Sequence, residues 1–275
     1  TVDGEVNGQR RLKLYNINLS DNYGAMDVPS VDPIIRYVEI EKTNIGIGAT
    51  HGSGGKFQYL YLHDIRGDAG IRLNARNGIN PQYDQTFVEN SEIQLNSYMD
   101  GRGDGPDGIQ GTYGLTVRNN IIYNQRGPVV LPNHNDFVQA QALYVKIYNN
   151  IFRNISDSAI DFDGHNAVGT LGHIIIFNNI FSMTYTAGIP SGIRLYSTNG
   201  PITQLEDIHI YSNTMVDQAM ASAGGIPIRF EYGGGNPTVN NVHIKNNIFY
   251  NSGKRGATSV VYIAPSSGFT SADWD

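Results

Sequence analysis

The sequence has no cysteine and a single tryptophan in 275 residues. Without cysteine the chain can form neither disulfides nor thiolate metal sites, and the redox compartment is left open. No apolar run reaches the roughly 18 residues that a membrane-spanning helix requires, so no membrane span is expected. No segment between the expected strands repeats its apolar residues with the period of about 3.6 that marks a helix. These absences indicate a protein built from strands.

Basic residues are also scarce. Lys and Arg number 19 against 25 Asp and Glu, a formal charge of 19 − 25 = −6. Because Lys and Arg form no cluster, a nucleic acid is not expected as the main partner, whereas an anionic polysaccharide held by a few local cations is compatible. Glycine is abundant (32), which suits many tight turns between short strands.

One short motif recurs five times: an alternating strand that ends in Asn-Asn (Ser-Asn in the fourth copy) and continues into a short apolar strand. The last Asn of this dipeptide falls at positions 120, 150, 179, 213 and 247, in steps of 30, 29, 34 and 34 residues. A repeat of this period built from strands is typical of a solenoid. Strands that return in the same direction stack as parallel sheets about 4.8 Å apart. The sequence therefore predicts an all-β fold, a parallel β-helix of about eight coils.

We expect residues 1–275 to form one β-helix domain. The chain starts without Met and stops abruptly at Asp275, so both ends resemble cuts in a longer repeat array. The second Asn of each pair is expected to face inward and to hydrogen-bond the equivalent amide in the coils above and below.

The last strand of each coil has an apolar-x-apolar pattern. Its apolar residues face inward, and the residues between them form rows along the outer surface. These strands are expected at Val129–Leu131, Ala159–Phe162, Gly192–Leu195, Pro227–Phe230 and Val260–Ile263. Their alignment predicts one outward row of Arg72, Leu131, Asp161, Arg194, Arg229 and Tyr262. Asp163 then faces outward two residues after Asp161. In the coil that opens at Thr86, the polar loop Ser97–Gly108 is expected in place of this strand.

A second alignment gathers the chemically active side chains. Asp107-Gly-Ile-Gln110 and Asp136-Phe-Val-Gln139 share Asp-x-apolar-Gln at a spacing of 29 residues, one coil. His134 and His165 lie about one coil apart in similar surroundings. The predicted cluster comprises Asp107, Gln110, His134, Asp136, Gln139, Asp161, Asp163 and His165. Its carboxylates could bind Ca²⁺ or act as acid and base, and its imidazoles titrate near neutrality. Alternatively, these are solvated or laddered polar residues, the default on the outside of a β-helix.

Two further groups complete the candidates. The glycine-rich loop with Asp100, Asp104 and Asp107 partly resembles an oxygen-ligand loop for Ca²⁺, although it lacks the closing Glu of an EF-hand. A second outward face with Lys146, His209 and His243 could hold the base of a lyase, but its even spread down the array fits a plain solvated sheet better.

The Asn-Asn-Ile-Phe repeats, with Asp-Gly-Ile-Gln and His-Asn-Asp-Phe-Val-Gln, resemble the right-handed parallel β-helix proteins of the pectate-lyase-like superfamily over about residues 35–265. The resemblance implies a right-handed, single-stranded β-helix. Its members include polysaccharide lyases, glycoside hydrolases, epimerases and non-catalytic surface or phage fibres. The polygalacturonase pattern and the pectate-lyase Arg-x-Pro-x-x-Arg are missing, and Gly164-His165-Asn166 only partly matches the Gly-His-Gly of polygalacturonases. No family's catalytic set can therefore be carried over.

The leading hypothesis is a secreted or cell-surface protein that cleaves an acidic polysaccharide by β-elimination. Arg194 or Arg229 would bind the uronate carboxylate, helped by Arg72, Gln110 and Gln139 as further substrate-binding residues. His134 or His165 would transfer the proton, and Asp136, Asp161 and Asp163 would hold a metal or orient histidine. The alternatives are an inverting glycoside hydrolase with these aspartates as the acid and base, and a non-catalytic glycan-binding or fibre segment. The sequence leaves the oligomeric state open.

Overall fold

The computed structural model describes residues 1–7, 9–10, 12–15, 24–30, 32–49, 54–73, 85–96, 106–111, 113–124, 135–140, 143–155, 157–163, 169–184, 190–197, 202–217, 225–232, 238–250 and 261–263. These residues form strands, turns and bends, and no helix occurs among them. Within this part of the chain there is accordingly no helix long and apolar enough to cross a membrane.

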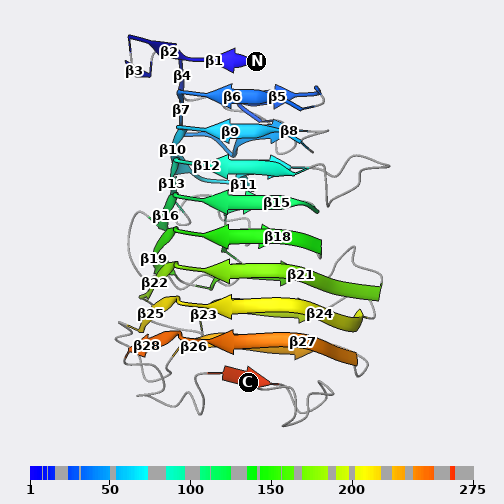
Figure 1. Ribbon diagram of the computed structural model, residues 1–275. Helices are drawn as coiled ribbons and strands as arrows, with labels where there is room; N and C mark the ends of the chain where they lie inside the picture. Colours follow the sequence, from blue (N-terminus) through cyan, green and yellow to red (C-terminus); the bar gives the residue numbers. More distant parts are fainter. Residues whose placement is uncertain are drawn as a thin grey trace.

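Three parallel sheets of nine strands each run the length of the molecule, with one strand of each sheet per coil (Figure 1). The first sheet contains β1 (Val2–Asp3), β6 (Ile34–Arg36), β9 (Lys56–Gln58), β12 (Thr86–Glu89), β15 (Leu115–Arg118), β18 (Leu143–Tyr148), β21 (Gly169–Phe177), β24 (Ile202–Tyr211) and β27 (Thr238–Lys245). The second contains β4 (Leu12–Tyr15), β7 (Val38–Glu41), β10 (Tyr61–Ile65), β13 (Glu92–Leu95), β16 (Ile121–Asn124), β19 (Ile151–Ile155), β22 (Ile180–Met183), β25 (Thr214–Asp217) and β28 (Ile248–Tyr250). The third contains β5 (Met26–Val28), β8 (Ile45–Ala49), β11 (Ala69–Leu73), β14 (Asp107–Gln110), β17 (Asp136–Ala140), β20 (Ser158–Asp163), β23 (Ser191–Ser197), β26 (Ile226–Tyr232) and β29 (Val261–Ile263).

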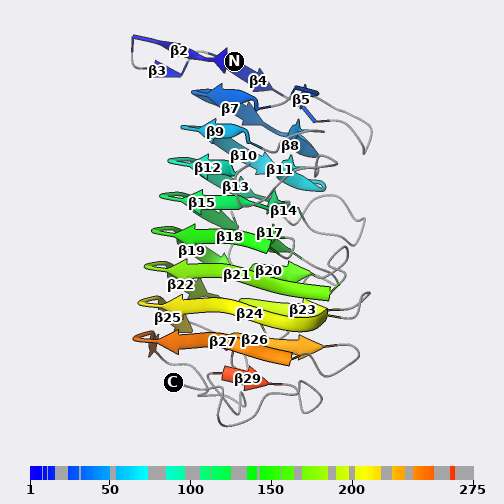
Figure 2. The same ribbon diagram turned by 45° about the vertical axis from the view of Figure 1, so that its right-hand side comes forward.

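The predicted parallel β-helix is thus confirmed. The number of levels differs slightly from the predicted eight, since each sheet has nine strands. A small antiparallel hairpin, β2 (Glu5–Val6) with β3 (Gln9–Arg10), lies at the N-terminal end (Figure 2).

Alternation along each strand builds the core. In β18, Val145 and Ile147 are fully buried, whereas Lys146 between them is exposed. The inward side chains of successive coils then stack on one another: the rings of Phe152 and Phe181 lie 5.0 Å apart across neighbouring strands of the second sheet. One continuous apolar core therefore fills the coil from β6 to β27.

The asparagine ladder is also confirmed. Asn150 Oδ1 accepts a hydrogen bond from Asn120 Nδ2 at 3.1 Å, and Asn150 Nδ2 donates to Asn179 Oδ1 at 3.0 Å. The same bond continues from Asn179 to Asn213 and from Asn213 to Asn247 at 3.0 Å. Ser91 extends the row by donating its backbone N–H to Asn120. The side chains satisfy polar groups that the bend between the first and second sheets would otherwise bury without partners.

The first Asn of each pair forms the bend between the first and second sheets. Asn119, Asn149 and Asn178 have φ of 56°, 58° and 58°. Asn adopts this left-handed region more readily than most residues do. The left-handed backbone at the first Asn makes the sharp bend between the first and second sheets. The Asn-Asn dipeptide thus combines a bend and a ladder.

Two expectations about the third sheet are wrong. In the coil that opens at Thr86, a third-sheet strand is present, β14. In the next coil, the strand that pairs with β20 is β17, so Gln139 rather than Leu131 stands next to Asp161. Val129–Leu131 lies outside the described residues. The shared Asp-x-apolar-Gln pattern sets this register, because Gln110 and Gln139 are paired neighbours.

Replacing a ladder asparagine should destabilise the protein more than replacing a bend asparagine. In Asn150→Ala, the buried N–H of Asn120, the carbonyl of Val117 and the amide of Asn179 each lose a partner. We expect a loss of about 1–3 kcal/mol for each buried group left unsatisfied. Urea denaturation followed by circular dichroism measures this. Asn149→Gly is the control, because glycine tolerates φ of 58°. Equal midpoints for the two variants would contradict the structural role of the ladder.

Candidate functional site

The outward row predicted for the third sheet is present in part, since Gln139 takes the position predicted for Leu131 and Gln110 stands in the coil before it. The paired neighbours are, in order, Arg72, Gln110, Gln139, Asp161, Arg194, Arg229 and Tyr262. Asp163 is paired with Tyr196 one coil on. The structure therefore brings together the sequence-predicted carboxylates and arginines of this face.

Arg194 is at the centre of this group. Its Nε and Nη2 donate to Asp161 Oδ1 and Oδ2 at 3.1 and 2.5 Å, a two-pronged ion pair. The same guanidinium lies 3.9 Å from Asp136 Oδ1 and 3.7 Å from Asp157 Oδ1. The guanidinium of Arg194 thus lies within ion-pair distance of three carboxylates.

The carboxylates of Asp107, Asp136 and Asp161 are buried, contrary to the expectation that outward residues are exposed. Asp136 and Asp161 are 0% exposed and Asp107 is 2% exposed. Asp107 Oδ1 accepts the backbone N–H of Asp136 at 2.9 Å, and its Oδ2 accepts from Gln110 Nε2 at 2.9 Å. The acids therefore form an internal network with Arg194, and a polymer in solvent does not reach them in this arrangement.

Burial changes the protonation of the network. It raises the pKa of Asp107 to about 8, with nearby Asp68 and Asp161 adding to the effect against the hydrogen bonds from Asp136 and Gln110. Burial, then the charges of Asp161 and Asp107, also raises the pKa of Asp136 well above its usual value. Near neutral pH, Asp107 is therefore mostly protonated.

The other predicted substrate-binding arginines have partners within the protein. Arg72 Nη1 is 2.7 Å from Asp68 Oδ2, and Arg229 forms an ion pair with Glu231. Both pairs bridge residues of the same coil. Each arginine already has one carboxylate partner within the protein, so a uronate would bind to its remaining guanidinium N–H groups.

Several candidates lie outside the described residues, and their proposed roles stay predictions: His134, His165, Asp100, Asp104 and the side chain of Asp163. Of the three proposed calcium ligands, only Asp107 is described. Asp107 is buried, and both of its carboxylate oxygens accept hydrogen bonds from within the protein. Its role as a calcium ligand stays a prediction.

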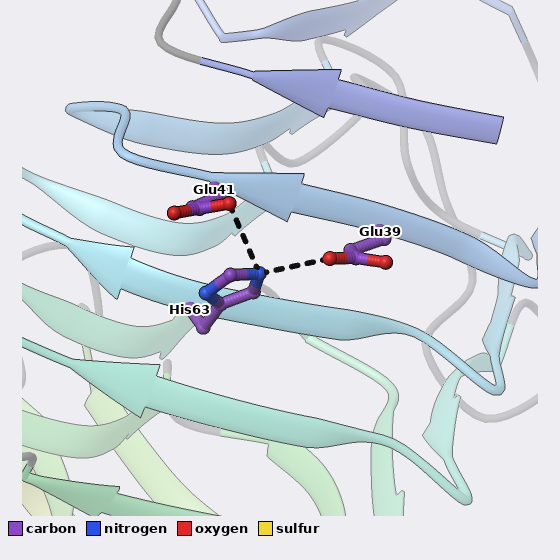
Figure 3. Close-up of side chains that lie close together, drawn as sticks. All are labelled: Glu39, Glu41 and His63. Atoms are coloured by element: carbon purple, nitrogen blue, oxygen red, sulfur yellow. Dashed lines mark hydrogen bonds and ion pairs between the residues drawn. The ribbon is translucent and has the colours of Figure 1, made fainter.

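A second acidic group lies on the outer face of the second sheet (Figure 3). Glu39 and Glu41 of β7 point toward His63 of β10, whose Nε2 lies 3.2 Å from Glu39 Oε1 and 3.8 Å from Glu41 Oε2. Lys13 Nζ lies 2.7 and 3.1 Å from the same two oxygens. The spacing of these atoms would suit a metal ion, but a lysine ammonium already neutralises the carboxylates. We assign this group to an ion-pair network between coils.

The first sheet carries an open groove on its outer face. Its volume is about 480 Å³, and it is lined by Gln85, Tyr144, Lys146, His173, Ile175, Asp207 and His209. Most of these residues come from β18, β21 and β24, which stack as neighbours (Figure 1). The sequence singled out Lys146 and His209 on this face but missed His173 and Asp207.

Two outward rows line the groove. Lys146, Ile175 and His209 are paired across successive strands. Tyr144, His173 and Asp207 precede them by two residues and have φ of 59°, 55° and 52°. They lie six residues before the ladder Asn of their own coils, so aligning the coils on the ladder would have placed them together.

His173 has the most defined contacts in the groove. Its Nδ1 lies 3.0 Å from Asp207 Oδ2, and its ring stacks on Tyr144 with centroids 4.4 Å apart. Asn241 donates its side-chain N–H to Asp207 Oδ1. Glu206 Oε1 lies 3.6 Å from Nε2, so the imidazole is covered on one face by Tyr144 and has a carboxylate near each nitrogen, with Asp207 the closer.

His209 is the second imidazole of the groove. Burial lowers the pKa of His209, and the neighbouring His243 lowers it further. The two rings stack with centroids 5.2 Å apart. A lowered pKa keeps His209 neutral near pH 7, so its ring can accept a proton.

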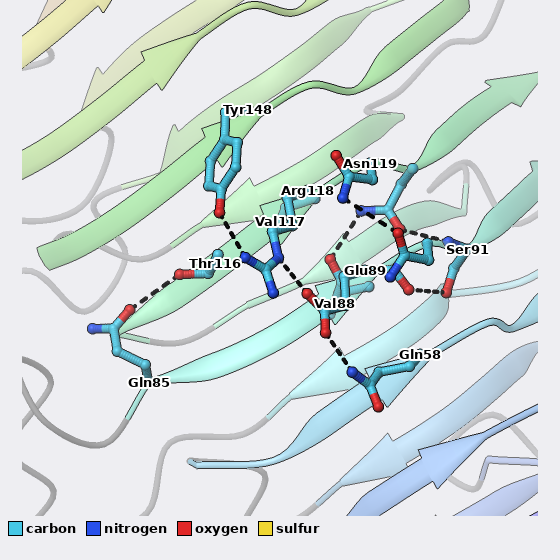
Figure 4. Close-up of polar contacts among 12 residues, drawn as sticks. Gln58, Gln85, Val88, Glu89, Ser91, Thr116, Val117, Arg118, Asn119 and Tyr148 are labelled. Carbon is cyan, nitrogen blue, oxygen red and sulfur yellow. Dashed lines mark hydrogen bonds and ion pairs between the residues drawn. The ribbon is translucent and has the colours of Figure 1, made fainter.

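A polar and aromatic ladder runs beside the groove (Figure 4). Glu89 bridges Gln58 and Arg118, and Arg118 Nη1 donates to the hydroxyl of Tyr148 at 3.0 Å. The ring of Tyr148 in turn stacks on the ring of Phe177, with centroids 4.8 Å apart. Tyr211 stacks on the other face of Phe177, with centroids 5.1 Å apart, so Phe177 offers no face for stacking on a sugar.

No family model matches the chain, and no curated protein or solved structure matches it either. The coil architecture is shown by the structure itself. The resemblance to the pectate-lyase-like superfamily depends on the sequence motifs together with this architecture.

The raised pKa of Asp107 predicts a pH-dependent stability. Asp107 is protonated in the folded protein up to pH about 8 and ionised in the unfolded chain above about pH 4. Its contribution to stability is therefore full below the unfolded pKa and falls by about 1.4 kcal/mol per pH unit until the folded pKa is passed. Asp107→Asn should reduce this slope. Thermal unfolding from pH 5 to 9 measures it, and an unchanged slope in the variant would contradict the assignment.

Arg194 should be the most sensitive arginine of the third sheet. Arg194→Met leaves the buried carboxylates of Asp161 and Asp136 without their cation, so we expect a loss of about 3–5 kcal/mol of unfolding free energy. Arg229→Met in the same row removes a more exposed pair and should cost about 1 kcal/mol or less. Urea denaturation compares the two. Similar losses would show that Arg194 does not neutralise the network.

Proposed function

We propose that this chain is a secreted or cell-surface protein of the pectate-lyase-like type, and that it cleaves a uronate-containing polysaccharide by β-elimination in the first-sheet groove. The proposal keeps the reaction class suggested by the sequence and moves its site from the buried aspartates to the open face. The observation that carries it is the convergence of a lysine and two histidines in one groove.

The groove supplies the groups that β-elimination needs. A cation must neutralise the uronate carboxylate so that the proton on the adjacent ring carbon becomes acidic, and a neutral base must remove that proton. Lys146 is a cation on an exposed outward position. His209, with its lowered pKa, and His173 are the imidazoles within the same groove.

The electrons of the broken C–H bond form the double bond of the unsaturated product. The bond between the neighbouring ring carbon and the glycosidic oxygen breaks at the same stage, and that oxygen takes up a proton. No water is consumed, so this chemistry needs no second carboxylate. Hydrolysis by the inverting route needs two carboxylates about 6.5–9.5 Å apart around a sugar. Asp207 is the sole carboxylate residue lining the described groove, and it already contacts His173.

Lysis of uronate polymers tests the proposal. The protein is incubated with polygalacturonate, alginate, hyaluronate and glucuronan, and the ultraviolet absorbance of unsaturated products is followed beside a reducing-end assay. We expect both signals to rise together on at least one polymer. Reducing ends without the absorbance would show hydrolysis instead, and the absence of both would leave a non-catalytic β-helix.

Lys146→Gln should then raise KM on the active polymer by about tenfold or more, the equivalent of one lost charge-assisted hydrogen bond. Lys56→Gln is the matched control, because Lys56 is exposed on β9 of the same sheet and does not line the groove. A KM for Lys146→Gln equal to that of the control would exclude Lys146 from carboxylate binding.

A further inference from the structure

We infer that His173 is the proton-transfer residue of the groove and that Asp207 positions it. This inference rests on the proposed function and names the residues that perform its central step. It depends on four observations. Asp207 contacts the His173 ring, and Asp207 is itself held by a neighbour. Nε2 of His173 has no carboxylate within hydrogen-bond distance, and His63 has similar local contacts but lies outside the groove.

The contact with Asp207 favours one tautomer of the neutral ring. Nδ1 lies 3.0 Å from Asp207 Oδ2, whereas Nε2 lies 3.6 Å from Glu206 Oε1, so a proton on Nδ1 has the nearer carboxylate. Nε2 is then left with its lone pair. The same arrangement of carboxylate and imidazole prepares a general base in other enzymes.

Asp207 is itself restrained. Asn241, one coil further on, donates to Asp207 Oδ1, so the carboxylate holds the ring with one oxygen and Asn241 with the other. At the preceding residue of β21, the added Cβ of an alanine at Gly172 would lie 2.5 Å from the carbonyl oxygen of Glu206. Close approach of β21 and β24 at this point brings the His173 and Asp207 side chains within contact.

The Nε2 atom can receive a proton from a bound molecule. The side chain of His173 is 32% exposed and lines the groove. Glu206 Oε1 lies 3.6 Å from Nε2, beyond hydrogen-bond distance. The other oxygen of Glu206 accepts from Gln204 Nε2 at 2.6 Å, which holds that carboxylate on its own strand.

In the reaction, Nε2 of His173 takes the proton from the ring carbon that bears the uronate carboxylate. The imidazolium that forms is stabilised by Asp207. The proton then passes from Nε2 to the departing glycosidic oxygen or to water, which restores the neutral ring. Lys146 neutralises the carboxylate, two residues along β18 from the Tyr144 ring that supports His173.

His63 provides an internal comparison. Its ring also stacks on a tyrosine, Tyr61, with centroids 4.4 Å apart, and its Nε2 faces two glutamates. However, its side chain is 14% exposed, and it lies on the second sheet beside Lys13 rather than in the groove. The two histidines share their local contacts and differ in access to a polymer.

The experiment compares His173→Gln, Asp207→Asn and His63→Gln on the polymer that the wild-type protein cleaves best among the four uronate polymers. We expect His173→Gln to lower kcat about 10²- to 10⁴-fold, the range for loss of a general base. Asp207→Asn should lower kcat about 10- to 100-fold with little change in KM, because Asp207 acts through His173. His63→Gln should match the wild type.

Two readouts separate chemistry from folding. The first is His173→Gly, which relieves the strained φ of 55° and should be rescued in part by added imidazole. The second is the nitrogen NMR spectrum of the ring, in which His173 should be the Nδ1-protonated tautomer in the wild type and should lose this preference in Asp207→Asn.

The outcomes are distinct. Cleavage by the wild type with full kcat in His173→Gln overturns the inference while the proposed function stands. An Nε2-protonated His173 in the wild type overturns the positioning role of Asp207. Cleavage of none of the four polymers overturns the proposed function, and the catalytic assignment of His173 with it.

Discussion

The hydrogen bond between an inward asparagine and its equivalent one coil on is the interaction that holds the coils of this protein in place. Each coil must bend between the first and second sheets, and a bend interrupts the backbone pairing that strands provide. Asn150 supplies the missing partners above and below while remaining 1% exposed. Because the same bond repeats in successive coils, it also fixes the register in which the coils stack.

That register decides what the outer surface can do. Residues about thirty positions apart become neighbours at the spacing of adjacent strands, so ion pairs and ring stacks form between coils. On the third sheet this brings Asp161 against Arg194 and closes the acids into a buried network. On the second sheet it gathers Lys13, Glu39 and Glu41 into an ion-pair cluster. On the first sheet the same stacking leaves a groove, where His173 meets Asp207.

The difference between these faces lies in how their charges are satisfied. An acid paired inside the protein contributes to stability and costs desolvation, as the raised pKa of Asp107 shows. An imidazole that contacts a carboxylate through one nitrogen, and whose other nitrogen is accessible, can still exchange a proton with a bound molecule. The convergence of Lys146, His173 and His209 in one groove, more than the number of acids, is why we locate the proposed reaction on the first sheet.

Residue order alone was enough to predict the parallel β-helix, the asparagine ladder and the outward row that joins Asp161 to Arg194, because strand alternation and a nearly constant coil length can be read directly along the chain. It could not predict that Asp161 is buried, since exposure depends on which neighbour covers a side chain and Arg194 does so from the next coil. It also did not reveal the pair of His173 and Asp207. Aligning the coils on the ladder asparagine would have placed both residues at equivalent positions, but the contact itself depends on the left-handed backbone and on the stacking of β21 on β24.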